Sequence, residues 1–247
     1  MRLDAWNFLT QSWDRAEQEK RRLEKAARIF FEDIERDDWV ACSKLIERGC
    51  SPNLSLGQKT AAMVAAECGA VNSLRLLAST GANLGAQDEK GRDAMFWAVQ
   101  TRANDIVDFL LARGPRLKRL FNDNSTALIE AAKGSYVHGV RALVAHERSW
   151  VDLYDRMGRT ALWHVLSKPS LSDADNEIAR ILMGSGANPD MGDLEGVTPR
   201  EASQSENAKS LVERNDLEAS IEPEAPAPQL DADQAIEPAA PSRRPRL

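Results

Sequence analysis

The amino-acid sequence predicts an all-α solenoid, a row of stacked helix-turn-helix units with short projecting turns. Similar segments begin at Thr60, Asp93, Thr126 and Thr160, at spacings of 33, 33 and 34 residues. Each of these starts is followed by an apolar stripe at helical spacing. Aromatic residues make up only 6% of the chain, so Ala, Leu, Val and Ile must form most of the core. A single helix pair cannot bury both of its apolar faces, and stacking on neighbouring units must therefore stabilise the array.

Each predicted unit has a helix start and a helix stop. Thr or Asp precedes the first helix, where its side chain can accept a hydrogen bond from a free backbone amide. Small residues then recur, which lets neighbouring helices approach closely. The second helix ends at a glycine such as Gly81 or Gly114, the residue that best adopts a left-handed cap. An Asp-x-x-Gly turn precedes three of the first helices, and Asn124 stands at the glycine position of another, which Asn tolerates.

The period and these signals resemble the ankyrin repeat, whose signature spans about 33 residues and opens with T-P-L-H-x-A. Thr198-Pro199 is the best local match to that opening, and Gly81-Ala82-Asn83 and Gly186-Ala187-Asn188 fit the repeat ends. The resemblance implies repeats that start near residues 28, 60, 93, 126, 160 and 198. Four of them are full repeats, and the first and last are imperfect.

This sequence departs from the ankyrin pattern at three places. The histidine of the signature is replaced throughout, so apolar packing is expected to substitute for the hydrogen bonds that the imidazole makes between repeats in that family. The replacing residues are Met63, Phe96, Ile129 and Trp163. The repeat that starts at Thr126 ends without glycine, which predicts a distorted turn. The repeat that starts at Thr160 has five extra residues between its helices, either a tolerated surface loop or a partner contact.

The array is predicted to occupy residues 28–214, between two flanks of different composition. Residues 1–27 have the pattern of an amphipathic, charged helix that lengthens or docks on the first repeat, or that binds another protein or a membrane interface. Residues 215–247 contain six of the eleven prolines and seven acidic residues. Such a composition cannot offset the entropy of ordering, so an acidic, Pro/Ala-rich disordered tail is expected.

Charge and cysteine content exclude several classes of protein. The net charge is −6 and the pI is about 5.3, which argues against nucleic-acid or anionic-membrane binding by bulk charge. Three cysteines form no CxxC motif and are too few for a disulfide scaffold. No stretch approaches the roughly 18 apolar residues of a membrane span. Asp4 and Asn7 stand where a signal peptide needs an apolar run. These features favour a protein of the cytoplasm.

The sequence gives little reason to expect catalysis. The histidines His138, His146 and His164 all fall within predicted repeat helices or at their ends, and none is close in sequence to a cysteine. The motifs HExxH, GxSxG, Walker A and GxGxxG do not occur. We therefore predict no catalytic residue, no metal site, no cofactor and no small-molecule substrate.

The resemblance implies instead that a partner protein meets the turn tips and the exposed ends of the first helices, along a concave groove. Phe96 and Trp97 are expected in the core rather than on this surface. Seven of the mapped side chains are cationic against three acids, Glu67 among them, which favours a partner with an acidic surface. The predicted partner-binding residues are Lys59, Glu89, Lys90, Arg92, Gln100, Asp123, Lys133, Arg156, Met157, Arg159 and Lys168.

The function that follows is that of a non-enzymatic scaffold or adaptor for protein–protein interaction. Two alternatives remain open. The closing Arg243-Arg244-Pro245-Arg246-Leu247 resembles the basic C-terminal signals of some exported bacterial effectors, which would make the array a trap for a host protein. The array could also belong to a regulatory or inhibitory subunit of an enzyme.

Overall fold

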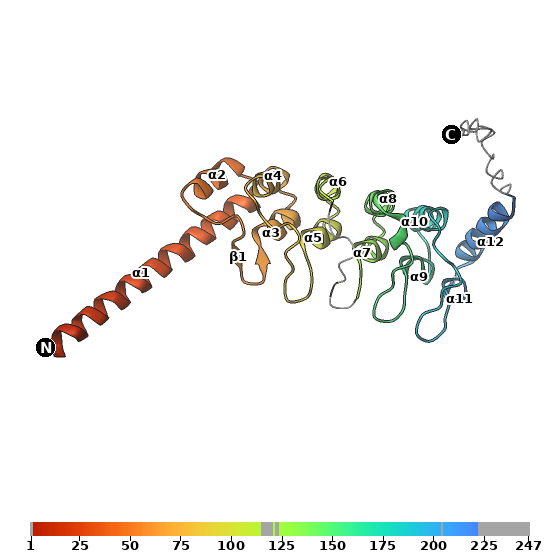
Figure 1. Ribbon diagram of the computed structural model, residues 1–247. Helices are drawn as coiled ribbons and strands as arrows, with labels where there is room; N and C mark the ends of the chain where they lie inside the picture. Colours follow the sequence, from red (N-terminus) through yellow and green to blue (C-terminus); the bar gives the residue numbers. More distant parts are fainter. Residues whose placement is uncertain (1, 115–120, 122–123, 204, 222–247) are drawn as a thin grey trace, which may run out of the picture.

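The computed structural model describes residues 2–114, 121, 124–203 and 205–221, and it shows a row of stacked helix pairs (Figure 1). The first helix of each pair lies in one layer and the second in the other. The first-layer helices are the end of α1 (Arg2–Glu35), α3 (Ala61–Cys68), α5 (Ala94–Gln100), α7 (Ala127–Lys133), α9 (Ala161–Leu166) and α11 (Pro199–Ala202). The second-layer helices are α2 (Trp39–Glu47), α4 (Val71–Ser79), α6 (Asn104–Leu111), α8 (Val137–His146), α10 (Asp173–Gly184) and α12 (Glu206–Ile221). The predicted helical solenoid with six units is confirmed.

The predicted helix starts act as caps. The side chains of Thr60, Asp93, Thr126, Thr160 and Thr198 each accept a hydrogen bond from the backbone amide three residues later. Asn124 has φ +58°, the left-handed conformation expected at the position where the other turns carry glycine. These five first helices therefore begin where the capping residues predict.

The core runs continuously along the stack. Fully buried side chains come from both layers, including Leu74, Leu77, Ile106, Leu162 and Leu182. Each first-layer helix contacts the first-layer helix of the next unit, and the second-layer helices do the same. Cohesion therefore comes from stacking between units, as the apolar stripes predict.

Two units are irregular where the sequence predicts it. After α8 the chain forms the short 3₁₀ helix η1 (Arg148–Trp150) in place of a glycine cap. Residues 167–172 lengthen the connection between α9 and α10. A two-stranded antiparallel hairpin, β1 (Ser55–Leu56) with β2 (Lys59–Thr60), precedes α3, and the helical pattern alone does not predict it.

Two predicted boundaries differ from the structure. Helix α1 runs without a break through residues 27 and 28, so no boundary lies there, and the charged N-terminal segment lengthens the first repeat helix, which is one of the arrangements that the sequence predicts. Helix α12 continues to Ile221, seven residues beyond Arg214, so the start of the expected disordered tail is helical. The rest of that tail, residues 222–247, lies outside the described residues. Within the described chain, no helix combines the length and apolarity that a membrane crossing requires.

Candidate partner-binding face

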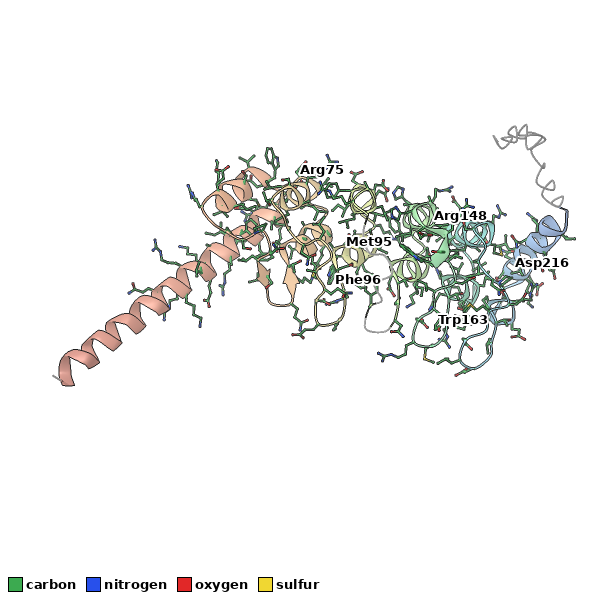
Figure 2. The ribbon with its side chains drawn as sticks, viewed as in Figure 1. Arg75, Met95, Phe96, Arg148, Trp163 and Asp216 are labelled. Atoms are coloured by element: carbon green, nitrogen blue, oxygen red, sulfur yellow. The ribbon has the colours of Figure 1, made fainter. Side chains whose placement is uncertain are left out.

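The predicted partner-binding residues lie on one side of the stack. The turns that precede α3, α5, α9 and α11 project in the same direction, and the first-layer helices sit directly above them (Figure 1). We call this surface, formed by the turns and the exposed sides of α3, α5, α7 and α9, the turn face. Phe96 and Trp163 lie on this side of the molecule, whereas Arg75 lies on the opposite, second-layer side (Figure 2). Of the predicted residues, Asp123 falls outside the described part of the chain.

Trp97 is at the centre of the turn face between two cations. The Nζ of Lys59, from the preceding unit, lies 3.8 Å from the centre of the indole ring, and the Cζ of Arg92 lies 4.7 Å from it. Lys59 Nζ also lies 2.5 Å from a carboxylate oxygen of Glu67. The ring is half-buried and packs on the core, and its buried Nε1 has no hydrogen-bond partner. Trp97 therefore packs on the core, as the sequence predicts, and is also partly exposed between the two cations.

Aromatic packing replaces an acidic turn in the next unit. Phe121 stands five residues before Thr126, the position that Asp88, Asp155 and Asp193 occupy before their own helices. Its ring meets that of Phe96 edge to face, with centroids 4.9 Å apart. A packed aromatic pair between neighbouring units thus takes the place of the aspartate.

Most of the predicted cations are paired with acids of the same chain. These pairs are Lys59 with Glu67, Arg92 with Asp88, Lys133 with Glu130, Arg159 with Asp193 and Lys168 with Asp175. The carboxylates of Asp88 and Asp193 are almost fully buried beneath their arginines. The basic excess that the sequence shows along the turns is therefore largely neutralised within the fold.

Lys168 is half-buried between two units of the array. Its Nζ donates to Asp175 Oδ1 at 2.6 Å, to Ser135 Oγ at 2.9 Å and to the carbonyl oxygen of Ala132 at 3.3 Å. Burial raises the pKa of Asp175, but hydrogen bonds from Lys168, Ser172 and Ser135 outweigh it and lower that pKa to about 2. Lys168 therefore joins two units, and its predicted place among the partner contacts is not what the geometry favours.

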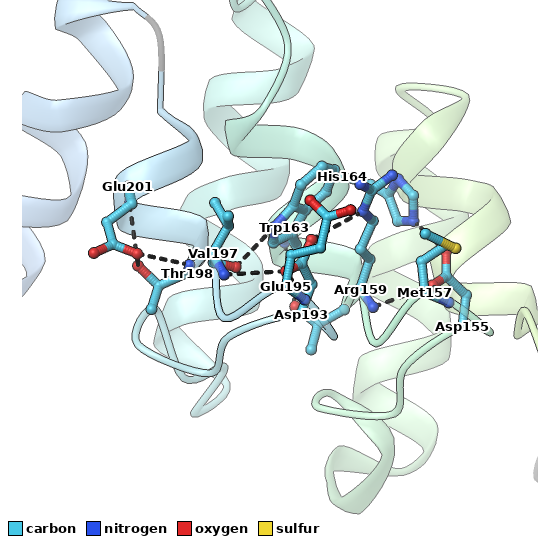
Figure 3. Close-up of polar contacts among 11 residues, drawn as sticks. Asp155, Met157, Arg159, Trp163, His164, Asp193, Glu195, Val197, Thr198 and Glu201 are labelled. Carbon is cyan, nitrogen blue, oxygen red and sulfur yellow. Dashed lines mark hydrogen bonds and ion pairs between the residues drawn. The ribbon is translucent and has the colours of Figure 1, made fainter.

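A chain of polar contacts links the last two turns, residues 155–159 and 193–197 (Figure 3). Arg159 Nε donates to Asp193 Oδ2 at 3.3 Å, and the Cζ of Arg159 stacks 4.0 Å from the centre of the Trp163 ring. Trp163 Nε1 donates to the carbonyl oxygen of Val197, in the next unit, at 3.2 Å. Trp163 occupies the position of the family's histidine. It makes a hydrogen bond between units that the expected apolar packing would not supply.

His164 forms a pair with Asp155 beside this chain of contacts. Its Nε2 lies 2.7 Å from Asp155 Oδ2, and Asp155 also accepts the backbone amides of Met157 and Arg159. Burial lowers the pKa of His164, although the Asp155 carboxylate opposes that shift. Burial would raise the pKa of Asp155, but the hydrogen bonds from His164 and from the two amides lower it. The pair fixes the turn that carries Met157.

The tips of the turns that these hydrogen bonds and ion pairs hold carry exposed side chains. Glu89, Lys90 and Arg156 are exposed, as are Met157 and Leu194, whose exposed fractions are 43% and 73%. The backbone amide of Leu194 donates to the carbonyl oxygen of Met157 at 3.0 Å, which joins the tips of two neighbouring turns. Leu194 is not among the predicted partner-binding residues, although an apolar residue inside an Asp-x-x-Gly turn is a signal for an exposed apolar tip.

The described residues offer little for chemistry. No group of three or more His, Cys, Asp or Glu side chains among them could hold a metal ion. Gln100 donates to Glu130 at 3.0 Å, and Glu130 also binds Ser125 and Lys133, so these polar groups satisfy one another. Cys42, Cys50 and Cys68 are free cysteines, and burial raises the pKa of Cys42 to about 12, which leaves its thiol protonated.

Comparison with known proteins agrees with this architecture. Residues 35–120 match the family model for ankyrin repeats. Over 111 residues, 45% of this chain, the sequence is 34% identical to the ankyrin repeat domain-containing protein SAT10 of Stachybotrys chartarum, and the match spans only 6% of that protein's length.

Two solved structures share the fold. An ankyrin repeat domain from Acinetobacter baumannii AYE matches 77% of this chain and 97% of its own, with a TM-score of 0.69 and 24% identity. The ankyrin repeat domain of Bcl-3, a member of the IκB protein family, matches 74% of this chain and 81% of its own, with a TM-score of 0.67 and 23% identity. Ankyrin repeats generally mediate interactions between proteins. Residues 35–120 therefore match ankyrin repeats in sequence, and the chain as a whole has the fold of an ankyrin-repeat solenoid.

Proposed function

We propose that this protein is a non-enzymatic scaffold or adaptor that binds a partner protein through the turn face. The observation that supports the proposal is the pair of exposed apolar tips, Met157 and Leu194, held side by side by a backbone hydrogen bond. Apolar side chains fixed in place at a projecting surface lose little entropy when a partner covers them. The half-buried Trp97 between its two cations offers a second apolar contact on the same face.

The charge that a partner meets is set by the turn tips. Lys59, Arg92 and Arg159 form ion pairs with acids of the chain itself, and the side chains of Lys90 and Arg156 are exposed at turn tips. A partner whose surface combines an apolar patch with acidic residues fits this arrangement. Rim charges of this kind act mainly on the association rate.

Site-specific photo-crosslinking tests where the partner binds. A photoreactive residue is placed at Lys90 or Met157 on the turn face and, as matched controls, at Lys44 or Arg180 on the second-layer helices, all of them exposed. We expect the same protein to be crosslinked from both turn-face positions and from neither control. Crosslinking from the control positions alone would place the interface on the opposite side and contradict the proposal.

Charge reversal tests the acidic character of the partner. Lys90→Glu with Arg156→Glu should slow association with the crosslinked protein, most strongly at low salt, because exposed charges are screened as salt rises. Lys44→Glu with Arg180→Glu is the control and should leave the rate unchanged. Equal rates for the two double variants would show that the tip cations do not select the partner.

The identity of the crosslinked partner separates this proposal from its alternatives. An enzyme whose activity falls on binding would indicate a regulatory or inhibitory subunit. A partner from another organism, together with export that requires residues 243–247, would indicate an effector. The three free cysteines are consistent with the cytoplasmic location that we propose.

A further inference from the structure

Helix α1 carries an apolar stripe that the array covers only at one end. The stripe recurs at alternating steps of three and four residues, the spacing that keeps one face of a helix toward a partner helix. Its positions are Trp6, Leu9, Trp13, Ala16, Lys20, Leu23, Ala27, Phe30 and Ile34, and Lys20 is the one charged residue among them. Phe30 and Ile34 are fully buried in the first unit, whereas Leu23 is 63% exposed.

The N-terminal part of α1 leaves the stack before the stripe ends. Among the described elements, α1 contacts α2, α3 and β1, and in Figure 1 its N-terminal part projects from the end of the row with no labelled element beside it. In proteins, most of the stability of a helix comes from packing of its amphipathic face rather than from propensity alone. Of the stripe positions from residue 6 to residue 23, the structure describes the side chains of Lys20 and Leu23, and both are exposed on this face of the helix.

We propose that this face pairs with the same face of a second copy of the chain, as an antiparallel helix pair centred between residues 14 and 15. In this register, position 13 of one copy shares a layer with position 16 of the other, which sets tryptophan opposite alanine. Position 9 then lies opposite position 20, and position 6 opposite position 23. Bulky positions of one copy therefore meet small or flexible positions of the other.

Charge distribution favours this arrangement over a parallel pair. The antiparallel register sets the flanking positions of Glu17 and Glu19 opposite those of Thr10 and Ser12, so no like charges meet there. A parallel pair would place Lys20 against its own copy in the central layer. It would also bring the flanking positions of Glu19 and Glu24 together, and such like-charge pairs are destabilising.

Antiparallel pairing leaves both arrays accessible. Each array begins near residue 28, so the two arrays leave from opposite ends of the helix pair, about 40 Å apart along its axis. Two turn faces on one dimer would bind a repetitive or dimeric partner with avidity, because the second contact becomes intramolecular.

Sedimentation equilibrium on the full chain tests the proposal. We expect a species of twice the 27.3 kDa chain mass. Leu23→Glu places a charge in the stripe at an exposed position, so it should leave the melting temperature unchanged and shift the protein to monomer. Gln18→Glu introduces the same side chain at an exposed position off the stripe and should remain dimeric. A wild-type chain that stays monomeric over the whole concentration series would overturn the proposal, whatever other helix it binds.

A distance measurement tests the orientation of the helices. A spin label at position 25, as Lys25→Cys in a Cys68→Ser background, lies off the stripe on an exposed part of α1. The antiparallel register separates the two labels by more than about 30 Å, given a rise of about 1.5 Å per residue. A parallel pair would hold them at roughly 20 Å or less. The short distance would overturn the antiparallel arrangement.

Discussion

At the scale of single residues, the position of the family's histidine is filled in two different ways. Met63 and Ile129 are fully buried there and contribute packing alone. Trp163 instead donates its indole N–H to the Val197 carbonyl oxygen of the next unit. Trp97, one position further along its own helix, has a buried indole N–H without an acceptor. The two tryptophans therefore form a natural comparison between a satisfied donor and an unsatisfied one.

Trp163→Phe should lower the free energy of unfolding by about 1 kcal/mol, because an aromatic ring is kept while the hydrogen bond to the Val197 carbonyl oxygen is lost; that oxygen still accepts from the Asp193 amide. Trp97→Phe is the control. It removes a buried donor that has no partner, so it should cost less or even stabilise, apart from a weaker interaction with Lys59 and Arg92. Urea denaturation of both variants measures the difference. Equal losses would show that the Trp163 hydrogen bond contributes nothing.

His164 predicts how stability depends on pH. Burial lowers its pKa in the folded chain, with Lys133 and Arg159 also disfavouring its charged form and Asp155 favouring it. When the pH falls below the ordinary histidine value of about 6.5, the unfolded chain takes up a proton that the folded chain resists. The stability contribution of neutral His164 is thus present at neutral pH and lost as the pH falls.

We expect His164→Gln to flatten the dependence of unfolding free energy on pH between about 7 and 5, where one such group contributes a slope of at most about 1.4 kcal/mol per pH unit. His146→Gln, at an exposed position, is the matched control and should leave the wild-type slope unchanged. Denaturation curves across this pH range give the slopes. A variant slope equal to that of the wild type would refute the assignment to His164.

Lys168 tests the distinction between a structural cation and a contact cation. Lys168→Ala leaves the buried carboxylate of Asp175 with only Ser135 and Ser172 as side-chain donors, so we expect a loss of about 2–3 kcal/mol in unfolding free energy. Lys90→Ala, at an exposed tip, should change it by no more than roughly 0.5 kcal/mol. Denaturation measures both variants. If Lys168→Ala left the free energy of unfolding unchanged, Lys168 would be a candidate partner contact rather than a structural cation.

At the scale of elements, neighbouring turns are held together by backbone contact. Gly158 has φ +79°, and a Cβ added there would lie 2.8 Å from the backbone nitrogen of Leu194, the group that donates to Met157. Glycine is therefore required at this position for two reasons, its backbone conformation and the close approach of the next turn. Gly196 has a similar φ of +81°, but an added Cβ would meet nothing within 4 Å.

Gly196→Ala should consequently cost only the conformational strain, about 1–2 kcal/mol. Gly158→Ala should cost more than this, because the turn of the following unit must also shift. Thermal unfolding of the two variants separates the cost of backbone strain from the cost of the clash with the next turn, because the strain is nearly the same in both. Equal melting temperatures would mean that the turn-to-turn contact does not constrain the fold.

At the scale of the whole molecule, α12 closes the C-terminal end of the stack. Its Ala208 and Val212 are buried, and Asp216 Oδ2 accepts from Arg200 Nη1 at 2.8 Å, which ties the helix to α11 (Figure 2). Arg200 also binds Asp190 in the preceding turn at 2.8 Å. The end of the array is thus capped by a helix that reaches seven residues beyond the boundary predicted from composition.

Two truncations check where the folded array ends. Removal of residues 222–247 should leave the melting temperature unchanged, because the acidic, Pro-rich sequence has few apolar residues with which to join a core. Removal of residues 215–247 deletes Asp216 and the end of α12, and should lower the melting temperature by about 2–4 °C. Differential scanning calorimetry of both chains gives the comparison. If the chain that lacks only residues 222–247 melts at a lower temperature than the full chain, the tail stabilises the array.

The sequence by itself determined the architecture. A period of 33 or 34 residues, a capping side chain before each first helix and the tolerant Asn124 are local signals, and local hydrogen bonds and sterics are enough to interpret them. The same signals placed Lys90, Arg156 and Met157 at exposed turn tips, because a turn position follows directly from its distance to the next helix.

Only the tertiary structure decided which polar groups stabilise the array and which face a partner. The contacts of Lys168 with Ser135 and of Trp163 with Val197 join residues 33 and 34 positions apart, across neighbouring units. Their existence depends on how one unit is rotated and translated against the next, which the pattern within a unit does not specify. The place where α1 leaves the array also depends on tertiary packing. Residue propensities favour a helix on both sides of residue 27, but packing on the first unit alone decides where that helix leaves the array.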